Sequence, residues 1–186
     1  MQKRTILWDI TSKCNLRCRH CYNADKYFSN KEYPVLNTSQ IGAVLKKLSL
    51  SGFNHIHLLG GEPLVRQDIW EIIREAGRRN IETTLNTNGT LLTPANISRL
   101  LAARNLSQIV ISLDGPTGVA NDKIRGKGVF KNVTSNIRNL AAAVKKRRSK
   151  VITAISSVIS EDNAAQLYKF GALAESLGVN YLFLLN

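Results

Sequence analysis

Cysteine is scarce in this 186-residue sequence: only three are present, and all of them lie between residues 14 and 21. An odd number of closely spaced thiols does not suit the paired disulfides of secreted proteins, so it favours metal ligation in a reducing compartment. The chain also lacks an apolar run long enough to span a membrane, and Asp9 interrupts its first apolar stretch before a signal-peptide core could form. We therefore expect a cytoplasmic protein without a membrane segment.

Acidic residues are also few, since 13 Asp and Glu stand against 26 Lys and Arg and give a formal net charge of +13. Part of this excess lies in residues 145–150, which we call the basic run. Cations at the end of a helix interact favourably with its negative dipole end, and this alone would explain the run. Alternatively, the run attracts an acidic partner such as an electron-transfer protein, a peptide or RNA. Charge alone does not decide between these interpretations.

No linker or low-complexity segment divides the chain, and 186 residues with 44% hydrophobic content describe one globular domain. Short β-branched or apolar runs alternate with segments of helical periodicity, a pattern typical of repeated strand–helix units. The predicted strands cover residues 5–10, 55–59, 82–86, 108–113, 151–158 and 181–185. Helices are predicted after the capping residues 37–39, over 68–79, from Thr93-Pro94 onward, over 129–144 and over 163–177.

Helical crossovers return each strand in the same direction, so the predicted strands should be parallel, with their carboxyl ends at one rim. Chemically unusual stretches follow the first four strands: the cysteines, Gly60-Gly61-Glu62-Pro63, Thr87-Asn88-Gly89 and Ser112-Leu113-Asp114-Gly115. In barrel-like α/β folds the functional residues lie at this rim. Because six strands are too few to close a barrel, we predict an α/β fold that forms a partial, TIM-like (β/α)6 open barrel of parallel strands.

The cysteine spacing C-x3-C-x2-C can place three thiolates around one metal centre, and soft thiolates select zinc or iron–sulfur clusters. A structural zinc site needs a fourth protein ligand, and the adjacent His20 would reach the same ion only through a strained loop. His55 and His57 lie in a predicted strand and are weaker candidates. A 4Fe-4S cluster with three cysteine ligands leaves one iron open to a cofactor or substrate. The residues therefore favour the cluster but leave zinc as an alternative.

The cysteine motif after the first strand, together with Gly60-Gly61-Glu62-Pro63 after the second, resembles the radical S-adenosylmethionine (radical SAM) superfamily. The resemblance extends over essentially the whole chain. The residue before the last cysteine is often aromatic in that family, whereas His20 stands there in this sequence and Tyr22 follows the cysteine. This form is frequent among peptide- and tetrapyrrole-modifying (SPASM-type) members. The resemblance implies a partial barrel that holds a 4Fe-4S cluster and SAM.

The resemblance also implies roles for individual residues. Cys14, Cys18 and Cys21 would ligate three irons of the cluster, and the methionyl amine and carboxylate of SAM would chelate the fourth. The residues expected around SAM are His20, Tyr22, Gly60, Gly61, Glu62, Pro63, Asn86, Thr87, Asn88, Ser112 and Arg125.

Some of these residues have a purely structural alternative. Ser112 and Arg125 match positions that hold the SAM carboxylate and ribose in peptide-modifying relatives, but Arg125 could also be a solvated cation of the long loop in which we place it. Residues 60–63 and 88–89 could simply form turns, because Gly-Pro-rich and Asn-Gly sequences favour them. Asp114 is interpreted as a turn residue.

In this superfamily, an electron delivered to the cluster cleaves SAM to methionine and a 5′-deoxyadenosyl radical, which abstracts hydrogen from a substrate. The resemblance thus implies a radical SAM enzyme that matures or crosslinks a peptide, or alternatively one that modifies a tetrapyrrole side chain. An acidic flavodoxin- or ferredoxin-like protein would supply the electron. Such relatives usually continue into a cysteine-rich extension with auxiliary clusters, so we expect residues 1–186 to form a core domain that lacks a C-terminal extension.

A protein of another class is also compatible with the composition, namely a zinc-stabilised RNA-binding module. Its cysteines would serve folding, and the basic run would contact phosphates. Only 6% of the residues are aromatic, and the gathering of motifs after the strands would have no function in such a module. Nucleic acid is therefore an alternative partner and not the expected one.

Overall fold

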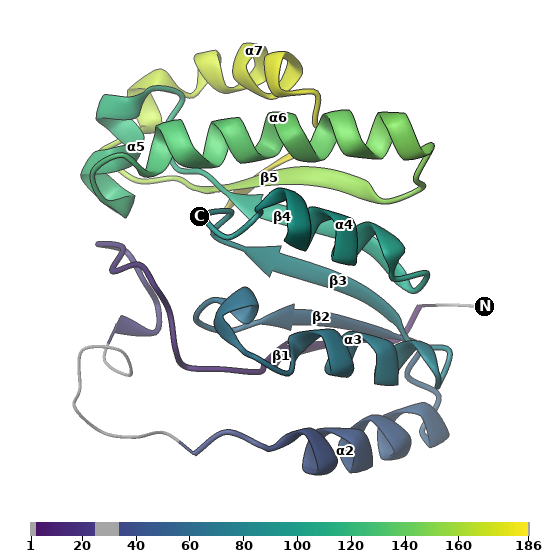
Figure 1. The fold of residues 1–186 in the computed structure, drawn as a ribbon. Coiled ribbons are helices and arrows are strands. Elements are labelled where there is room, and N and C mark those ends of the chain that lie inside the picture. Colours follow the sequence, from purple (N-terminus) through teal and green to yellow (C-terminus); the bar gives the residue numbers. More distant parts are fainter. Residues whose placement is uncertain (1–2, 25–33, 186) are drawn as a thin grey trace.

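The computed structural model describes residues 3–24 and 34–185 of the chain. Its centre is a sheet of six parallel strands that lie side by side in the order of the sequence (Figure 1). The strands are β1 (Thr5–Asp9), β2 (His55–Leu59), β3 (Glu82–Thr87), β4 (Leu106–Ser112), β5 (Ile152–Val158) and β6 (Tyr181–Leu185). Among the described residues, β1 pairs only with β2 and β6 only with β5, so the sheet does not close. The predicted open α/β barrel is confirmed.

Helices connect successive strands and cover the outer face of the sheet (Figure 1). They are α2 (Thr38–Leu50), α3 (Ile69–Gly77), α4 (Pro94–Ala102), α5 (Gly118–Arg125), α6 (Val129–Arg147) and α7 (Tyr168–Leu177), with short 3-10 turns at Pro63–Val65 and Ala164–Gln166. Two of the predicted helix starts have a clear chemical cause. Asn37 and Gln40 form a capping box at the start of α2, and the Thr93 hydroxyl accepts a hydrogen bond from the Asn96 N–H at the start of α4.

The hydrophobic core lies between the outer face of the sheet and the helices. Alternate strand residues that are fully buried on this face include Ile56, Leu58, Leu85, Ile109, Ile111 and Ile155. Successive strand residues point to opposite faces, so the residues between them face the inside of the barrel, and several are polar. There His55 Nε2 lies 2.9 Å from Thr84 Oγ1, and His57 Nε2 lies 2.6 Å from Asn86 Oδ1. The inner face of β2 and β3 is therefore polar below the rim.

The sequence did not predict α5, because it contains weak helix formers such as Gly118. In the structure the Thr117 hydroxyl caps the helix by accepting a backbone N–H three residues further on. Gly115 allows α5 to pack closely on the segment after β4, since a Cβ at Gly115 would lie 2.3 Å from the backbone nitrogen of Asn121. The interpretation of Arg125 as a long-loop residue is wrong: Arg125 is buried and is the last residue of α5.

The other predicted elements are present; the strands over 55–59 and 181–185 have the predicted bounds, and the ends of the remaining strands and of the helices over 68–79 and 129–144 differ by at most three residues. The predicted helix over 163–177 is divided into a 3-10 turn and α7. Before that turn, Asn163 Nδ2 donates to the carbonyl oxygens of Asp114 and Val158, both at 2.8 Å. These bonds tie Asn163 to the ends of β4 and β5 ahead of the helix.

Among residues 3–24 and 34–185, no helix has the length and apolarity of a membrane span.

The structure also shows where the basic run lies. The run begins in the last turn of α6, where Arg147 Nη1 donates to the Ser98 carbonyl at 3.2 Å. The segment that carries the cysteines, residues 14–21, lies nearer the opposite end of α6 (Figure 1). This position agrees with cations that stabilise a helix C-terminus and keeps the run away from the cysteines.

Candidate functional site

Residues 10–24, which we call the cysteine loop, cross the rim formed by the carboxyl ends of the strands (Figure 1). The first half of the loop is attached to the segment after β2, where the Gly61 N–H donates to the Thr11 carbonyl at 2.8 Å. The second half is attached to α5, where the Arg19 N–H donates to the Ile124 carbonyl at 2.9 Å. The cysteines are thus held between two sides of the open barrel.

A cavity of about 260 Å³ lies at this rim and brings the predicted site residues together. Its lining includes Cys14, Cys18, Cys21, His20, Tyr22, Gly60, Gly61, Pro63, Asn86, Thr87, Asn88, Ser112 and Arg125, so of the predicted site residues only Glu62 lies outside it. The lining residues that the sequence analysis missed are Leu16, Leu59, Ser156, Val158 and Leu185. Ser156 could have been found, because it lies near the carboxyl end of the predicted strand 151–158, and in the structure it pairs with Ser112 of β4.

The loop after β2 packs directly on the cysteine loop. A Cβ at Gly61 would lie 2.1 Å from the Lys13 carbonyl oxygen, and Gly60 has a φ of +127°, which disfavours any residue with a side chain. The N–H groups of Gly61 and Glu62 donate to the Thr11 and Lys13 carbonyls at 2.8 and 2.9 Å. The glycines are therefore needed for packing, and these two N–H groups are not available to a ligand.

Glu62 is fully buried and braces two loops of the rim. Its carboxylate accepts hydrogen bonds from Leu64 N–H at 3.0 Å and, at the end of the neighbouring strand β3, from Thr87 Oγ1 at 2.9 Å. It also accepts one from Asn88 N–H at 2.7 Å. Burial raises the pKa of Glu62 above its ordinary value, against the lowering effect of these donors. The side chain connects the loop after β2 to the loop after β3 and does not face the cavity.

Hydrogen-bond donors lie close to two of the three cysteine sulfurs. Cys14 Sγ accepts from Leu16 N–H at 3.4 Å and from Asn88 Nδ2 at 3.8 Å, and Cys18 Sγ lies 3.9 Å from Arg125 Nη1. Burial raises the pKa of both the Cys14 and the Cys18 thiol, so both are protonated at neutral pH in the metal-free protein. Donors of this kind stabilise the negative charge that a sulfur carries once it ligates a metal.

The cysteines suit a cluster better than a single ion. In the described parts of the chain, no group of three or more His, Cys, Asp or Glu side chains is arranged to hold one metal ion. A cluster distributes its ligands over several irons, so its sulfurs need to surround a common space and not to meet at one point. His20 directs Nε2 to Asp114 at 2.7 Å, while His55 and His57 bond to neighbours inside the barrel. The donor set therefore fits an iron–sulfur cluster.

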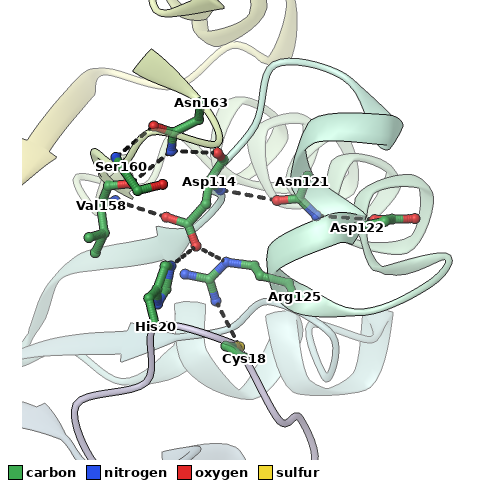
Figure 2. A network of polar contacts seen from close by, with 9 residues as sticks. All are labelled: Cys18, His20, Asp114, Asn121, Asp122, Arg125, Val158, Ser160 and Asn163. Carbon is green, nitrogen blue, oxygen red and sulfur yellow. Dashed lines mark hydrogen bonds and ion pairs between the residues drawn. The ribbon is translucent and has the colours of Figure 1, made fainter. Parts of the chain in front are cut away.

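Asp114 is fully buried and is more than a turn residue (Figure 2). Its Oδ1 accepts from the Val158 N–H at 2.8 Å, and its Oδ2 lies 2.7 Å from His20 Nε2 and 2.5 Å from Arg125 Nε. Burial alone would raise the pKa of Asp114, but the hydrogen bond from His20 and the charge of Arg125 hold this pKa below its ordinary value. The carboxylate thus links the cysteine loop to β5 and α5.

Most of the polar groups predicted around SAM already have partners within the protein. Asn86 bonds to His57, and Thr87 donates to Glu62. Tyr22 donates to Asp9 Oδ1 at 3.2 Å and is 74% exposed. Within residues 3–24 and 34–185, the hydroxyl of Ser112 has no hydrogen-bond partner. It is therefore a polar group of the cavity that a ligand can bind without breaking an existing bond.

Comparison with known proteins explains this arrangement. The sequence model of the Radical SAM superfamily matches residues 8–170. The chain belongs to the radical SAM superfamily. Proteins of this superfamily bind a 4Fe-4S cluster and SAM, which accounts for three cysteines around one cavity. Membership in the radical SAM superfamily also decides against the alternative interpretation of the chain as a zinc-stabilised RNA-binding module.

Relatives within the superfamily act on different substrates, according to their names. The mycofactocin maturase MftC of Mycobacterium tuberculosis (strain CDC 1551 / Oshkosh) is 37% identical over 174 residues, which cover 93% of this chain and 42% of MftC. The AdoMet-dependent heme synthase of Methanosarcina barkeri (strain Fusaro / DSM 804) is 33% identical over 178 residues, covering 94% of this chain and 48% of the synthase. The chain thus spans less than half the length of these radical SAM relatives.

Solved structures share the fold. Streptococcus suis SuiB bound to its precursor peptide SuiA superposes with a TM-score of 0.81 at 15% identity, covering 98% of this chain and 39% of SuiB. SuiB has also been solved with bound S-adenosylmethionine. At this level of identity the likeness establishes the radical SAM fold alone.

The raised pKa values predict slow alkylation of the thiols in the cluster-free protein. Since the thiolate is the nucleophile, Cys14 and Cys18 should react with iodoacetamide more slowly at neutral pH than in the urea-unfolded chain. The difference should narrow as the pH rises through the raised pKa values. Mass spectrometry of peptides quenched at successive times measures each site. Equal rates in the folded and unfolded chains at neutral pH would contradict the expected protonation.

Proposed function

We propose that this chain is the core of a radical SAM enzyme, with Cys14, Cys18 and Cys21 holding a 4Fe-4S cluster and with SAM in the adjoining cavity. The observation that carries the proposal is that the three cysteines line one cavity with nearly all residues predicted around SAM. When bound, the cluster and SAM supply a 5′-deoxyadenosyl radical after the transfer of one electron. The chain positions these groups and keeps solvent from the radical.

The cavity offers different chemistry to the two ends of SAM. The N–H groups of Gly61 and Glu62 are already used, so the loop after β2 can meet the SAM amine, itself a donor, only through acceptor atoms. On the opposite side, Ser112 and Arg125 present a hydroxyl and a guanidinium to the cavity. These groups suit the carboxylate and ribose. Further contacts to SAM are proposed for His20, Tyr22, Pro63, Asn86, Thr87 and Asn88, which line the same cavity.

The proposed substrate is a peptide, and the reaction is peptide maturation or crosslinking. This is supported by the relative named as a maturase at 37% identity and by the fold shared with SuiB, which binds a precursor peptide. A tetrapyrrole is the second candidate, because a heme synthase is 33% identical over nearly the same length. Incubation with deuterated candidates separates the two, since only the true substrate transfers deuterium into 5′-deoxyadenosine.

Replacement of Cys18 with Ala should abolish the cluster and SAM cleavage together, because the two remaining thiolates leave one iron without its protein ligand. After anaerobic reconstitution, the parent chain should be brown, contain about four irons and release 5′-deoxyadenosine with dithionite. Cys18→Ala should fall to background in iron content and in product.

Tyr168→Phe, at a site that is 77% exposed and outside the cavity, serves as the matched control and should behave like the parent. Full iron content and normal SAM cleavage by the Cys18→Ala protein would refute the assignment of the cluster ligands. A colourless parent that binds one zinc would refute the enzyme proposal itself.

Ser112→Ala should weaken SAM binding with little effect on folding, because the lost hydroxyl has no partner in the described parts of the chain. One hydrogen bond contributes about 0.5–1.5 kcal/mol, so the SAM dissociation constant should rise roughly 2- to 12-fold. Ser107→Ala is the control, since Ser107 lies near the other end of β4 and bonds to the Thr83 carbonyl. Unchanged SAM affinity in Ser112→Ala would remove Ser112 from the proposed site.

We propose that an acidic electron donor docks on the cysteine loop and not on the basic run. Exposed Lys13 and Arg17 alternate along this loop with the partly buried Cys14 and Cys18, so the cations face outward beside the cluster ligands. The basic run lies at the far end of α6. Opposite charges at a docking surface accelerate encounter in a salt-dependent way.

The double variant Lys13→Gln/Arg17→Gln should therefore slow cluster reduction by an acidic flavodoxin at low ionic strength, and the difference should fade as salt is added. Lys145→Gln/Lys146→Gln removes the same charge from the basic run and should leave the rate unchanged. Stopped-flow absorbance measures the rate. If reduction were slower in Lys145→Gln/Lys146→Gln but not in Lys13→Gln/Arg17→Gln, the donor would dock on the basic run and the proposal would be wrong.

A further inference from the structure

Asp114 joins more separate segments of the rim than its place in a Ser-Leu-Asp-Gly turn would require (Figure 2). Its backbone N–H donates to Asn121 Oδ1 at 3.0 Å, and its carbonyl accepts from Asn163 Nδ2 at 2.8 Å. Its carboxylate contacts Val158 of β5, His20 of the cysteine loop and Arg125 of α5. A fully buried carboxylate is retained only where such partners offset the loss of hydration.

Arg125 extends this network to a cysteine sulfur. Its side chain is 8% exposed, its Nε lies 2.5 Å from Asp114 Oδ2, and its Nη1 lies 3.9 Å from Cys18 Sγ. Buried Arg125 Nε has no aligned hydrogen bond, so the contact with Asp114 is an ion pair. The planar guanidinium therefore bridges a carboxylate and a sulfur, and Figure 2 shows it between the two.

We propose that Asp114 is a positioning residue for the cluster: it holds the Arg125 guanidinium against the Cys18 sulfur, and the guanidinium thereby raises the reduction potential of the cluster. This inference rests on the proposed function. A cation and an N–H donor beside a ligand sulfur stabilise the reduced cluster, which carries one more negative charge than the oxidised cluster. Hydrogen bonds to the sulfurs and local charge are among the factors that set such potentials.

The negative charge of Asp114 by itself lowers the reduction potential of the cluster. The direction of the shift in the Asp114→Asn variant therefore distinguishes a charge effect from the positioning of Arg125. If Asp114 acted only through its negative charge, Asp114→Asn would raise the potential, since a repulsion would be lost. If it acts by holding Arg125, the neutral amide cannot accept from Val158, contact His20 and form the ion pair with Arg125 as the carboxylate does, so the guanidinium loses its anchor. Arg125 contacts the sulfur directly, so its displacement should outweigh the lost carboxylate charge and lower the potential.

Asp162 provides a matched control that contacts two of the same segments as Asp114, namely the cysteine loop and α5. Its carboxylate pairs with Arg19 of the cysteine loop at 3.1 Å and with Lys123 of α5 at 2.5 Å, but it contacts neither Arg125 nor Cys18 among the described residues. Asp162→Asn therefore removes the same charge from the same neighbourhood and leaves the Arg125 bridge in place.

The experiment is an EPR-monitored redox titration of the reconstituted chain without SAM. Asp114→Asn and Arg125→Gln should both shift the midpoint potential to more negative values, whereas Asp162→Asn should leave it unchanged or raise it. Arg125→Lys keeps the charge, but its single ammonium lacks the fork that contacts both groups, so it should give an intermediate shift. In the Arg125→Gln variant, the additional Asp114→Asn substitution should cause no further fall in the midpoint potential.

A cluster-loaded Asp114→Asn protein with an unchanged or higher potential would overturn the proposal, as would an unchanged potential in Arg125→Gln. If circular dichroism shows that Asp114→Asn does not fold, the potentials of Arg125→Gln and Arg125→Lys still test whether the guanidinium raises the potential of the cluster. If it folds but loses its iron while Asp162→Asn keeps it, positioning of the site by Asp114 is supported, and the Arg125 variants decide the potential. A parent chain that binds no cluster would reject the proposed function itself, and this inference with it.

Discussion

The common direction of the six strands is the constraint on which the rest of the structure depends. Parallel strands need crossover connections, and these bring every carboxyl end to the same rim. The cysteine loop after β1, the glycine loop after β2, the Asn-Gly segment after β3 and the Asp114 segment after β4 consequently meet around one cavity. Residues separated by more than a hundred positions, such as Cys18 and Arg125, come within contact distance for this reason.

Two buried carboxylates fix this rim from opposite sides. Glu62 ties the loops after β2 and β3, and Asp114 ties the cysteine loop to α5 and β5. An uncompensated buried charge is costly, so each carboxylate holds its partners in a restricted geometry. The cysteine loop has little regular structure of its own and depends on these braces and on the Gly61 contact for its position.

The same fold serves relatives whose names indicate a peptide maturase and a heme synthase. A shared core can therefore define the cofactor chemistry and leave the choice of substrate to other features. In this chain the cavity is lined mainly by residues that hold the cysteine loop or are proposed to contact SAM. Ser156, Val158 and Leu185 lie on the side of β5 and β6, where the sequence motifs assign no cofactor contact.

The sequence by itself determined the alternation of strands and helices, the starts of α2 and α4 and the gathering of the cysteines with Gly60 and Gly61. Periodicity and capping, which are local properties of the chain, define the strands and helices, and the parallel direction of strands joined by helical crossovers then brings the two segments to one rim. Only the tertiary structure decided that Gly118–Arg125 is helical, that Glu62 faces away from the cavity and that Asp114 is a buried anchor for Arg125. Each of these outcomes depends on a contact between residues distant in sequence, such as Ile124 of α5 with Arg19 or Thr87 with Glu62, and the energy of such a contact is not encoded in any short segment.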